Sequence, residues 1–239
     1  MARAIVIETS GEGRPLPSST ASAEVLIDPD SGSERLLQRV LRFPPGATGN
    51  VGHAGADDVL YVTHGSGVLE SLVREERHAL GPGTAALVLS KLPAQVVNAG
   101  AEELEVVSVW SPPPFEGVFT MEARIAPLAS LREEDQESLP AGEDRYFKLL
   151  IQSEHVTQFV GFIDKSKAPP HTHTYEEAIY VVEGEGLLHA DEKLTPIGPG
   201  TSVFLPPGTP HCLENQGPGV LKVLGVFSPP GSPAAKQDA

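Results

Sequence analysis

The segment Glu177-Ala-Ile-Tyr-Val-Val-Glu-Gly-Glu-Gly186 repeats, with substitutions, the earlier segment Asp58-Val-Leu-Tyr-Val-Thr-His-Gly-Ser-Gly67. An acidic residue, a Tyr-Val pair and two glycines match at a constant offset of 119 residues. Downstream the offset becomes 117, and it aligns Trp110-Ser-Pro-Pro113 with Phe227-Ser-Pro-Pro230 and Asn98 with Asn215. The two halves are therefore copies that differ by two residues in one hairpin. A repeat of this length is typical of a duplicated domain, because solenoid units are much shorter.

Each copy is predicted to be all-β. The 24 glycines and 23 prolines of the 239-residue chain lie between short apolar runs, and apolar residues make up 40% of the total. Runs rich in β-branched and aromatic residues, each bounded by turn residues, are typical of strands. They include Leu104–Trp110, Phe159–Asp164, Ala178–Val182, Thr201–Leu205 and Val220–Phe227. We expect each copy to form a small antiparallel barrel or sandwich.

The boundary between the copies is predicted in the segment 131–145, which reads LREEDQESLPAGEDR. This segment is acidic, poor in apolar residues and interrupted by Pro140 and Gly142, which favours a solvated connector. The prediction is an N-terminal barrel over 1–130, an acidic linker over 131–145 and a C-terminal barrel over 146–239.

Composition excludes several classes of partner. A formal net charge of −15 leaves no basic cluster to bind a nucleic-acid backbone or an anionic membrane. The single cysteine, Cys212, forms no internal disulfide, so nothing requires an oxidising compartment. The apolar run Ala4–Ile7 is too short for a signal-peptide core, and no stretch approaches the ~20 apolar residues of a transmembrane helix. We expect a soluble, cytoplasmic protein that acts on a small molecule.

Two imidazoles and a carboxylate share one strand parity in the run Pro169-Pro-His171-Thr-His173-Thr-Tyr-Glu-Glu177. Alternate residues of a strand face the same side, so His171, His173 and Glu177 should all point into the barrel. Glu176 should point outward into solvent. A β-bulge after His173 would reverse the choice between the two glutamates.

A further ligand should come from another strand, because one short segment cannot surround a metal ion. His211 follows Pro206-Pro-Gly208-Thr-Pro210, a tight turn in which proline and glycine restrict the backbone ahead of the histidine. Three imidazoles and a carboxylate leave one or two positions open on a divalent first-row metal, which is what a catalytic site requires.

This pattern resembles the cupin superfamily, whose motifs read G-x5-H-x-H-x(3,4)-E-x6-G and G-x5-P-x-G-x2-H-x3-N. Lys165 stands where the first motif begins with glycine. The remaining motif positions are occupied by His171, His173, Glu177 and Gly184 in the first motif, and by Gly200, Pro206, Gly208, His211 and Asn215 in the second. The resemblance implies two tandem cupin-type barrels (a double-stranded β-helix, or jelly roll). It also implies one divalent transition metal, Fe, Mn, Ni, Cu or Zn, held by His171, His173, Glu177 and His211.

The N-terminal copy is predicted to hold no metal. The offsets place Gly52, Ala54, Asp58 and Ala94 at the four ligand positions, and one carboxylate cannot retain a metal ion. We therefore expect one metal ion per chain and a structural or interface role for this barrel. Because antiparallel barrels expose strand edges, a homodimer is also expected.

Three residues beside the motifs carry weaker expectations. His189 lies in a predicted hairpin, and Cys212 has the wrong parity to join its neighbour His211, so neither is expected to be a ligand. Tyr175 shares the parity of the ligands, and it either lines the pocket or packs in the core.

Cupin-like barrels carry out many reactions, so the fold does not define the reaction. The resemblance favours a mononuclear-metal dioxygenase of the quercetinase and acireductone type, in which Glu177 could also act as a catalytic base. One alternative is a non-redox lyase or aminohydrolase of the oxalate decarboxylase or ureidoglycine aminohydrolase kind. Another is a non-enzymatic module that binds a small molecule.

Overall fold

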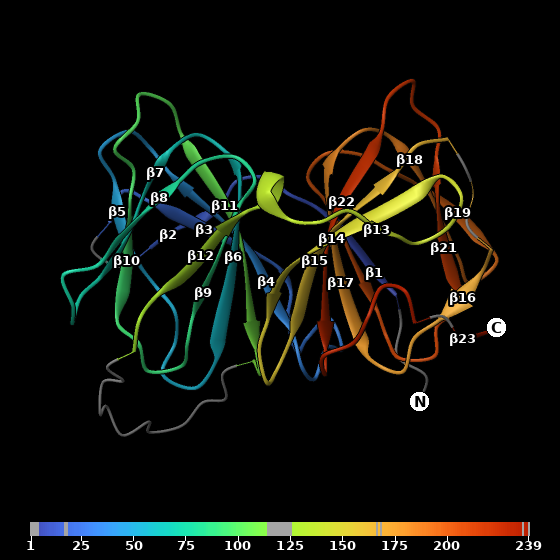
Figure 1. Cartoon of the computed structure of the whole chain (residues 1–239), viewed down its shortest axis with the longest axis horizontal. Coiled ribbons are helices and arrows are strands. Elements are labelled where there is room, and N and C mark those ends of the chain that lie inside the picture. Colours follow the sequence, from blue (N-terminus) through green and yellow to red (C-terminus); the bar gives the residue numbers. More distant parts are fainter. Residues whose placement is uncertain are drawn as a thin grey trace. The chain divides into compact units, whose positions relative to one another are not determined.

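The structure is a computed structural model that describes residues 5–16, 19–113, 126–165, 167, 169–235 and 237–238. Within these ranges it consists of antiparallel β-strands and one short 3₁₀ helix (Figure 1). No helix in the described part of the chain is long and apolar enough to cross a bilayer. The chain forms two compact units, of which the N-terminal unit comprises Gly11–Pro29 and Glu34–Asp135. The C-terminal unit comprises Met1–Ser10, Asp30–Ser33 and Gln136–Ala239.

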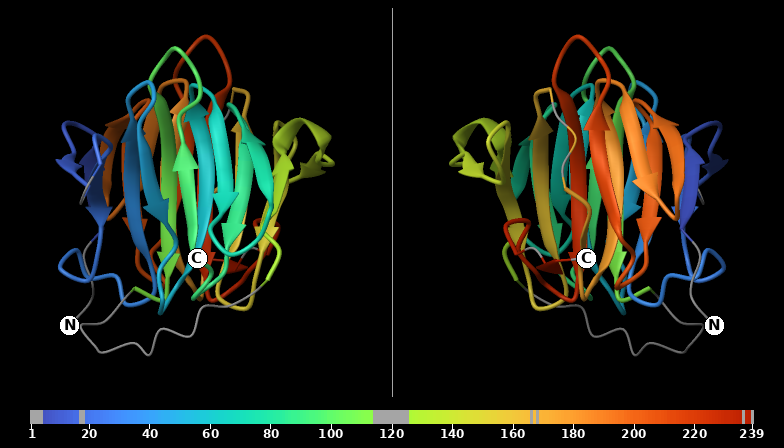
Figure 2. Two further views of the ribbon diagram at one scale, coloured as in Figure 1. Left: turned by 90° about the vertical axis from the view of Figure 1, so that its left-hand side faces the viewer. Right: turned by 90° about the vertical axis from the view of Figure 1, so that its right-hand side faces the viewer.

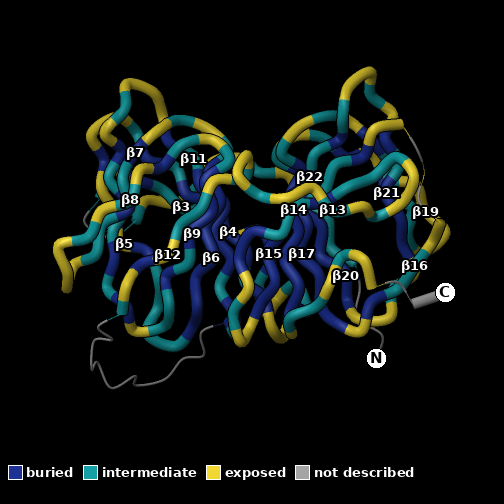
Figure 3. The backbone as a smooth tube through the Cα atoms, viewed as in Figure 1, coloured by how far each residue is buried: buried dark blue, intermediate teal, exposed yellow. Residues whose placement is uncertain are grey.

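The N-terminal unit contains two antiparallel sheets. Their strand orders are β12-β9-β6-β11-β4-β3-β2 and β5-β10-β7-β8. Alternate residues of the central strands, such as Leu41 and Phe43 of β4, pack into one buried apolar cluster, as alternation predicts. Figure 3 shows that the tube is mostly buried along β4 and β6. The elements are β2 (Arg14–Pro15), β3 (Ser22–Ile27), β4 (Leu37–Phe43), β5 (Thr48–Val51), β6 (Asp57–His64), β7 (Gly67–Ser71), β8 (Arg77–Leu80), β9 (Thr84–Val88), β10 (Ala94–Val97), β11 (Leu104–Ser111), β12 (Ala129–Arg132) and the 3₁₀ helix η1 (Glu133–Asp135).

The C-terminal unit repeats this arrangement. Its sheets have the orders β1-β20-β17-β22-β15-β14-β13 and β19-β18-β21-β16-β23. The strands are β1 (Val6–Thr9), β13 (Leu139–Pro140), β14 (Arg145–Gln152), β15 (Thr157–Ile163), β16 (His171–Thr172), β17 (Glu176–Glu183), β18 (Gly186–Ala190), β19 (Lys193–Ile197), β20 (Thr201–Leu205), β21 (His211–Asn215), β22 (Leu221–Ser228) and β23 (Gln237–Asp238). The prediction of an all-β chain with two barrels is therefore confirmed.

The first strand of the chain belongs to the C-terminal unit. Strand β1 pairs with β20, with Val6 opposite Phe204 and Thr9 opposite Thr201, and Ile5 and Ile7 pack against the core of this unit. In Figure 2 the blue strand β1 accordingly lies beside orange strands. The domain ranges predicted above assign residues 1–130 to one barrel, and this part of the prediction needs correction. An apolar edge strand gains both hydrogen bonds and burial from whichever sheet edge is free, and local sequence does not specify that edge.

The predicted linker 131–145 is also more ordered than a solvated connector. It includes the end of β12, which pairs with β9, then η1, and then β13, which pairs with β14. The Tyr61 hydroxyl donates a hydrogen bond to Glu133, so one acidic side chain of this segment is tied to strand β6. The acidic composition therefore reflects exposed side chains on backbone that is paired.

The two additional residues of the N-terminal copy lie in its second hairpin. After β7 come a loop of five residues, 72–76, and the four-residue strand β8, which together are two residues longer than the corresponding segment of the C-terminal copy. There the five-residue strand β19 follows β18 after Asp191 and Glu192 alone. Both of these residues have positive φ, 49° and 59°, as a two-residue hairpin turn of the I′ type requires.

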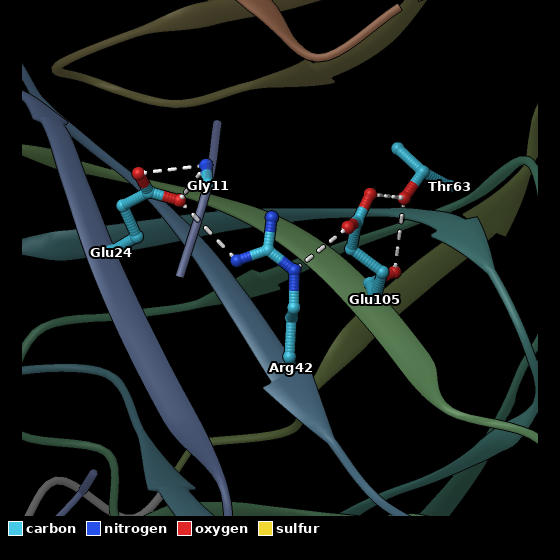
Figure 4. Close-up of polar contacts among 5 residues, drawn as sticks. All are labelled: Gly11, Glu24, Arg42, Thr63 and Glu105. Carbon is cyan, nitrogen blue, oxygen red and sulfur yellow. Dashed lines mark hydrogen bonds and ion pairs between the residues drawn. The ribbon is translucent and has the colours of Figure 1, made fainter. Parts of the chain in front are cut away.

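A ladder of ion pairs links neighbouring strands of the N-terminal unit. Arg42 of β4 contacts Glu24 of β3 and Glu105 of β11, at 3.3 and 3.2 Å (Figure 4). The Thr63 hydroxyl donates to Glu105, and the amide of Gly11 donates to Glu24. These side chains lie on the opposite face of the sheet from the apolar cluster, so this charged group stabilises the strand register and is separate from any cavity.

Candidate metal centre

Two turns and two strands bring the motif residues together. His171 of β16 is paired directly with His211 of β21. The amide of Gly208 donates a 2.7 Å hydrogen bond to the carbonyl of His173, and Gly208 has a φ of 77° that only glycine adopts readily. The proline- and glycine-rich turn of the second motif is thus fastened to the histidine segment of the first.

The three imidazoles form a compact cluster. One ring nitrogen from each of His171, His173 and His211 lies within 4.8 Å of the other two, and no other group of histidine, cysteine or acidic side chains within the described ranges shares this geometry. Glu177 joins two of the three, since its Oε2 atom lies 3.3 Å from His211 Nε2 and 3.6 Å from His173 Nε2.

This donor set fits a divalent metal. Glu177 Oε2 is buried and receives no hydrogen bond of good geometry from the described residues. A buried carboxylate oxygen without such a bond is costly unless a cation neutralises it. Imidazole nitrogens with a carboxylate oxygen suit Fe, Mn, Ni, Cu and Zn. The four side chains predicted from the sequence are therefore the ones that converge in the barrel.

Burial keeps two of the imidazoles neutral. It lowers the pKa of His171 to about 4, with further lowering from positive charge on His211 and His173. Burial likewise lowers the pKa of His173. Since a histidine binds metal only in its neutral form, both rings are ready to act as ligands near neutral pH.

His211 and Glu177 shift each other's pKa in opposite directions. Burial by itself would lower the pKa of His211, but the adjacent Glu177 raises it above the usual value. Burial would raise the pKa of Glu177, but His211 and the other two imidazoles hold it below the usual value. A metal ion entering this site would therefore displace a proton from His211.

Glu176 differs from its prediction. It faces away from the imidazoles, as the parity argument requires, but it is buried, with 1% exposure. The Ser33 hydroxyl donates a 2.8 Å hydrogen bond to Glu176 Oε2. The expectation of a solvated carboxylate was therefore wrong, because this side chain is buried against Ser33.

Tyr175 packs behind a ligand. Its ring stacks on His173 with a centroid separation of 4.8 Å and contacts Phe227 at 4.3 Å. Its hydroxyl donates to the carbonyl of Ser232. Of the two alternatives left open by the sequence, the structure supports packing, in a position that restricts the orientation of the His173 ring.

His189 and Cys212 lie outside the cluster. His189 Nε2 lies 2.6 Å from Glu214 Oε2, which accounts for its position on β18. Cys212 is fully buried, and burial raises the pKa of its thiol, so it is an unreactive residue next to a ligand.

The cluster opens into a cavity of about 110 Å³. Its walls are mostly aromatic and aliphatic, and one arginine, Arg145, also lines it. The sequence argument missed Arg145 because it assigned this residue to the linker. Arg145 and the buried Phe147 are alternate residues of one strand, so their side chains face the same side of the sheet. This spacing was the signal in the sequence that Arg145 faces the interior of the barrel. The wall residues are Tyr146, Phe147, Phe159, Phe162, Ile163, Ile179, Leu213, Val223 and Phe227.

The N-terminal unit has small residues where the C-terminal unit has imidazoles, and a Cβ atom at Gly52 would lie 2.7 Å from Val88 Cγ1. Gly52, Ala54 and Ala94, which occupy the three histidine positions, all line a cavity of about 210 Å³. The fourth position, Asp58, is fully buried and accepts hydrogen bonds from the amide of Gly52 and the hydroxyl of Ser108.

A guanidinium group compensates the charge of Asp58. Arg39 NH2 lies 3.3 Å from Asp58 Oδ2, and the Arg39 guanidinium lies 3.6 Å above the ring of Trp110. The carboxylate that corresponds to Glu177 is thus neutralised by a side chain of the protein.

Comparisons with known proteins agree with this architecture. Residues 160–227 match the family model described as a cupin domain. A 68-residue region, 28% of this chain, is 41% identical to an uncharacterized protein of Methanocaldococcus jannaschii and covers 54% of that relative, so the match spans about half the relative's length.

Two solved structures show the same fold over most of the chain. Protein Ylba of E. coli superimposes with a TM-score of 0.75 at 16% identity, covering 95% of this chain and 91% of that one. A deletion mutant of oxalate decarboxylase from Bacillus subtilis superimposes with a TM-score of 0.71 at 16% identity, covering 93% and 76%. The family match identifies residues 160–227 as a cupin domain, and the structural likenesses show that the chain as a whole shares the fold of these two proteins.

Proposed function

We propose that the C-terminal unit binds one divalent transition metal through His171, His173, His211 and Glu177. We further propose that the protein is a mononuclear metalloenzyme of the dioxygenase type, acting on a small oxygenated organic molecule. The observation that carries this proposal is the convergence of three imidazoles and a buried carboxylate at the end of an apolar cavity.

Each ligand candidate has a distinct part in holding the ion. His171 and His173 are neutral through burial and need lose no proton. Glu177 supplies the negative charge that offsets the cation, and the packing of Tyr175 fixes the His173 ring. When bound, the metal would supply a Lewis acid with open coordination positions.

The cavity restricts the size of the substrate. A volume of about 110 Å³ is below the range of about 300 to 1,000 Å³ that is typical of sites for drug-sized ligands. Its aromatic walls exclude bulk water and strengthen electrostatic interactions inside. Compact molecules are therefore favoured over polycyclic ones.

The lining also bears on the reaction class. Among the described lining residues, Glu177 is the only carboxylate, and Arg145 remains protonated in proteins. Lyase and aminohydrolase reactions depend on general acid–base catalysis, for which Glu177 and the Tyr146 phenol are the candidates in the lining besides the imidazoles. Glu177 can accept a substrate proton if its bond to the metal is weak.

Metal analysis followed by substrate screening tests the proposal. Untagged protein is expected to contain about one equivalent of divalent metal and to consume oxygen with compact diketones or hydroxy acids. His211→Ala should abolish both, while Lys148→Gln, on β14 but absent from the cavity lining, should retain both. Turnover without oxygen consumption would contradict the dioxygenase assignment, and metal-free protein would contradict the site.

A cytoplasmic homodimer remains part of this proposal. Its support is indirect, since it comes from the single cysteine and from the exposed edges of antiparallel sheets. Light scattering that gives the mass of one chain at every concentration would contradict the dimer.

A further inference from the structure

The N-terminal unit contains a cavity of about 210 Å³ whose lining is mostly apolar. Val51, Leu92 and Ala94 are buried parts of this lining. Leu72 and Lys91 are exposed residues of the lining, and they mark its opening. With 50% exposure, Leu72 leaves apolar surface in contact with water. A ligand with an apolar body would cover this surface together with that of the inner residues.

The turn beside this cavity has lysine where the C-terminal copy has glycine. Residues 89–92 and 206–209 each form a turn closed by a backbone hydrogen bond, of 3.0 and 3.2 Å respectively. The third residue of each turn has a positive φ, 64° at Lys91 and 77° at Gly208. Glycine is favoured at such a position, because a side chain there strains the backbone. Lys91 therefore costs stability that the corresponding glycine does not.

Lys91 carries the formal charge of this cavity. The lining contains no aspartate, glutamate or arginine, and the Lys91 ammonium makes no ion pair or hydrogen bond within the described part of the chain. By contrast, Arg39 and Arg42 on the sheets of the same unit are paired with carboxylates. Burial lowers the pKa of His53, another residue of the lining, so its ring is neutral near pH 7. The ammonium of Lys91 is thus available to an anionic ligand.

We propose that this cavity binds a compact organic anion with an aliphatic body, and that the Lys91 ammonium contacts the anionic group. The apolar lining matches the aliphatic part of such a ligand, and the ammonium matches its charge. A strained residue persists where its side chain serves a site, which explains lysine in a turn that favours glycine. The volume lies below the range of about 300 to 1,000 Å³ typical of drug-sized ligands, so the ligand is small. No metal is needed for this binding, because the imidazole cluster belongs to the other unit.

A lysine that merely lies in solvent at a turn makes a different prediction. Its replacement would alter the stability of the turn and leave the affinity for ligands unchanged. Contact between Lys91 and an anion instead makes the affinity depend on the charge of the ligand. Pentanoate and pentanamide have nearly the same shape and differ in charge, so this pair of probes isolates the contribution of the ammonium.

The test measures binding of both probes by calorimetry to metal-stripped, dialysed protein. We expect the wild type to prefer pentanoate about fivefold, as is typical of a partly exposed ion pair, and Lys91→Gln to lose this preference. Lys148→Gln is the matched control, because Lys148 lines neither cavity, and it should change neither affinity. Ala54→Leu fills the cavity without removing Lys91 and should weaken both probes alike. Inorganic phosphate, which has no aliphatic body, should bind more weakly than pentanoate.

Four results would overturn the proposal: no preference for pentanoate in the wild type, a preference that survives in Lys91→Gln, unchanged binding by Ala54→Leu, or phosphate binding as tight as that of pentanoate. Lys91→Gly provides a variant that should fold at least as well as the wild type. It relieves the backbone strain, so we expect a higher melting temperature together with loss of the preference. A Lys91→Gly protein that keeps the preference for pentanoate would show that the ammonium does not contact the ligand.

Discussion

Gly225 lies directly against the ring of Phe159. A Cβ atom at position 225 would lie 2.2 Å from Phe159 Cζ, although the two residues belong to different strands, β22 and β15. The corresponding residues of the N-terminal unit are Ser108 and Arg39, and there the serine hydroxyl accepts a 2.8 Å hydrogen bond from the guanidinium. The same pair of positions thus forms an aromatic cavity wall in one barrel and a buried polar network in the other.

Substitution of Gly225 by alanine should disturb this wall. The new methyl group forces the Phe159 ring to move, and overpacking of this kind costs about 1 to 3 kcal/mol. We expect a lower midpoint in urea unfolding and weaker binding of ligands in the cavity. Gly198→Ala is the matched control, because a Cβ at position 198 meets no atom within 4 Å. Equal effects of the two substitutions would show that the contact with Phe159 is unimportant.

The two adjacent glutamates should respond differently to loss of charge. Glu177→Gln is expected to reduce metal occupancy sharply, because the amide cannot offset the charge of the cation. Glu176→Gln should leave occupancy unchanged, because this side chain faces Ser33 instead of the imidazoles. Elemental analysis of both desalted proteins measures the difference. Loss of metal from Glu176→Gln alone would mean that the ligand has been assigned to the wrong residue.

Metal binding should release protons near neutral pH. Glu177 raises the pKa of His211 above 6.5, so a fraction of His211 is protonated in the metal-free protein at pH 7 and must lose this proton. Calorimetric titration in two buffers of different ionisation enthalpy measures the number released. We expect a value above zero that grows as the pH is lowered from 8 to 7. Identical heats in both buffers would contradict the raised pKa of His211.

Acidification should also reduce stabilisation by the metal. At a hundredfold excess over its dissociation constant a metal ion stabilises the folded state by about 2.7 kcal/mol, and competition from protons lowers this excess. The difference in melting temperature between metal-loaded and chelated protein is expected to shrink between about pH 7 and pH 5. A difference that stays constant to pH 5 would indicate that the histidines are not ligands.

The metal-free protein should itself lose stability in acid. Burial lowers the pKa of His171 to about 4, below its value of 6.5 in the unfolded chain. Between pH 4 and pH 6.5 the unfolded chain therefore binds more protons at His171 than the folded chain does. The contribution of His171 to stability is complete above pH 6.5 and is lost as the pH falls toward 4. The raised pKa of His211 acts in the opposite direction. Its contribution to stability is complete below pH 6.5 and is lost as the pH rises above the pKa of the folded state. Chelated His171→Asn protein should lose less stability than chelated wild type between pH 6.5 and 4, as urea unfolding would measure.

Removal of Arg39 should destabilise the N-terminal unit. Arg39→Met leaves the carboxylate of Asp58 buried without its cation, which typically costs about 3 to 5 kcal/mol. The double variant Arg39→Met/Asp58→Asn should recover part of this loss. Arg42→Met removes a more exposed ion-paired arginine from the same strand and is expected to cost less, about 1 kcal/mol. Chemical unfolding measures all three, and a smaller cost for Arg39→Met than for Arg42→Met would contradict the buried pair.

Local spacing was sufficient for much of this architecture. The offsets of 119 and 117 residues revealed two copies, because duplicated strands retain their turn residues. The alternation of His171 and His173 placed both imidazoles on one face of a strand. The turn before His211 indicated a second segment that could supply a ligand to the same site. Both inferences follow from the period of a β-strand and from the conformations available to glycine and proline.

Long-range partners required the tertiary structure. Strand β1 completes the sheet edge at β20, Ser33 contacts the buried Glu176, and Arg145 enters a cavity wall from a segment that composition assigned to a linker. The sequence alone therefore determined which residues can serve as ligands and which barrel lacks them, since these depend on side-chain chemistry and strand parity. Only the tertiary structure decided what lies against those residues, because a pairing across more than a hundred residues depends on the whole sheet and leaves no periodic signal in the chain.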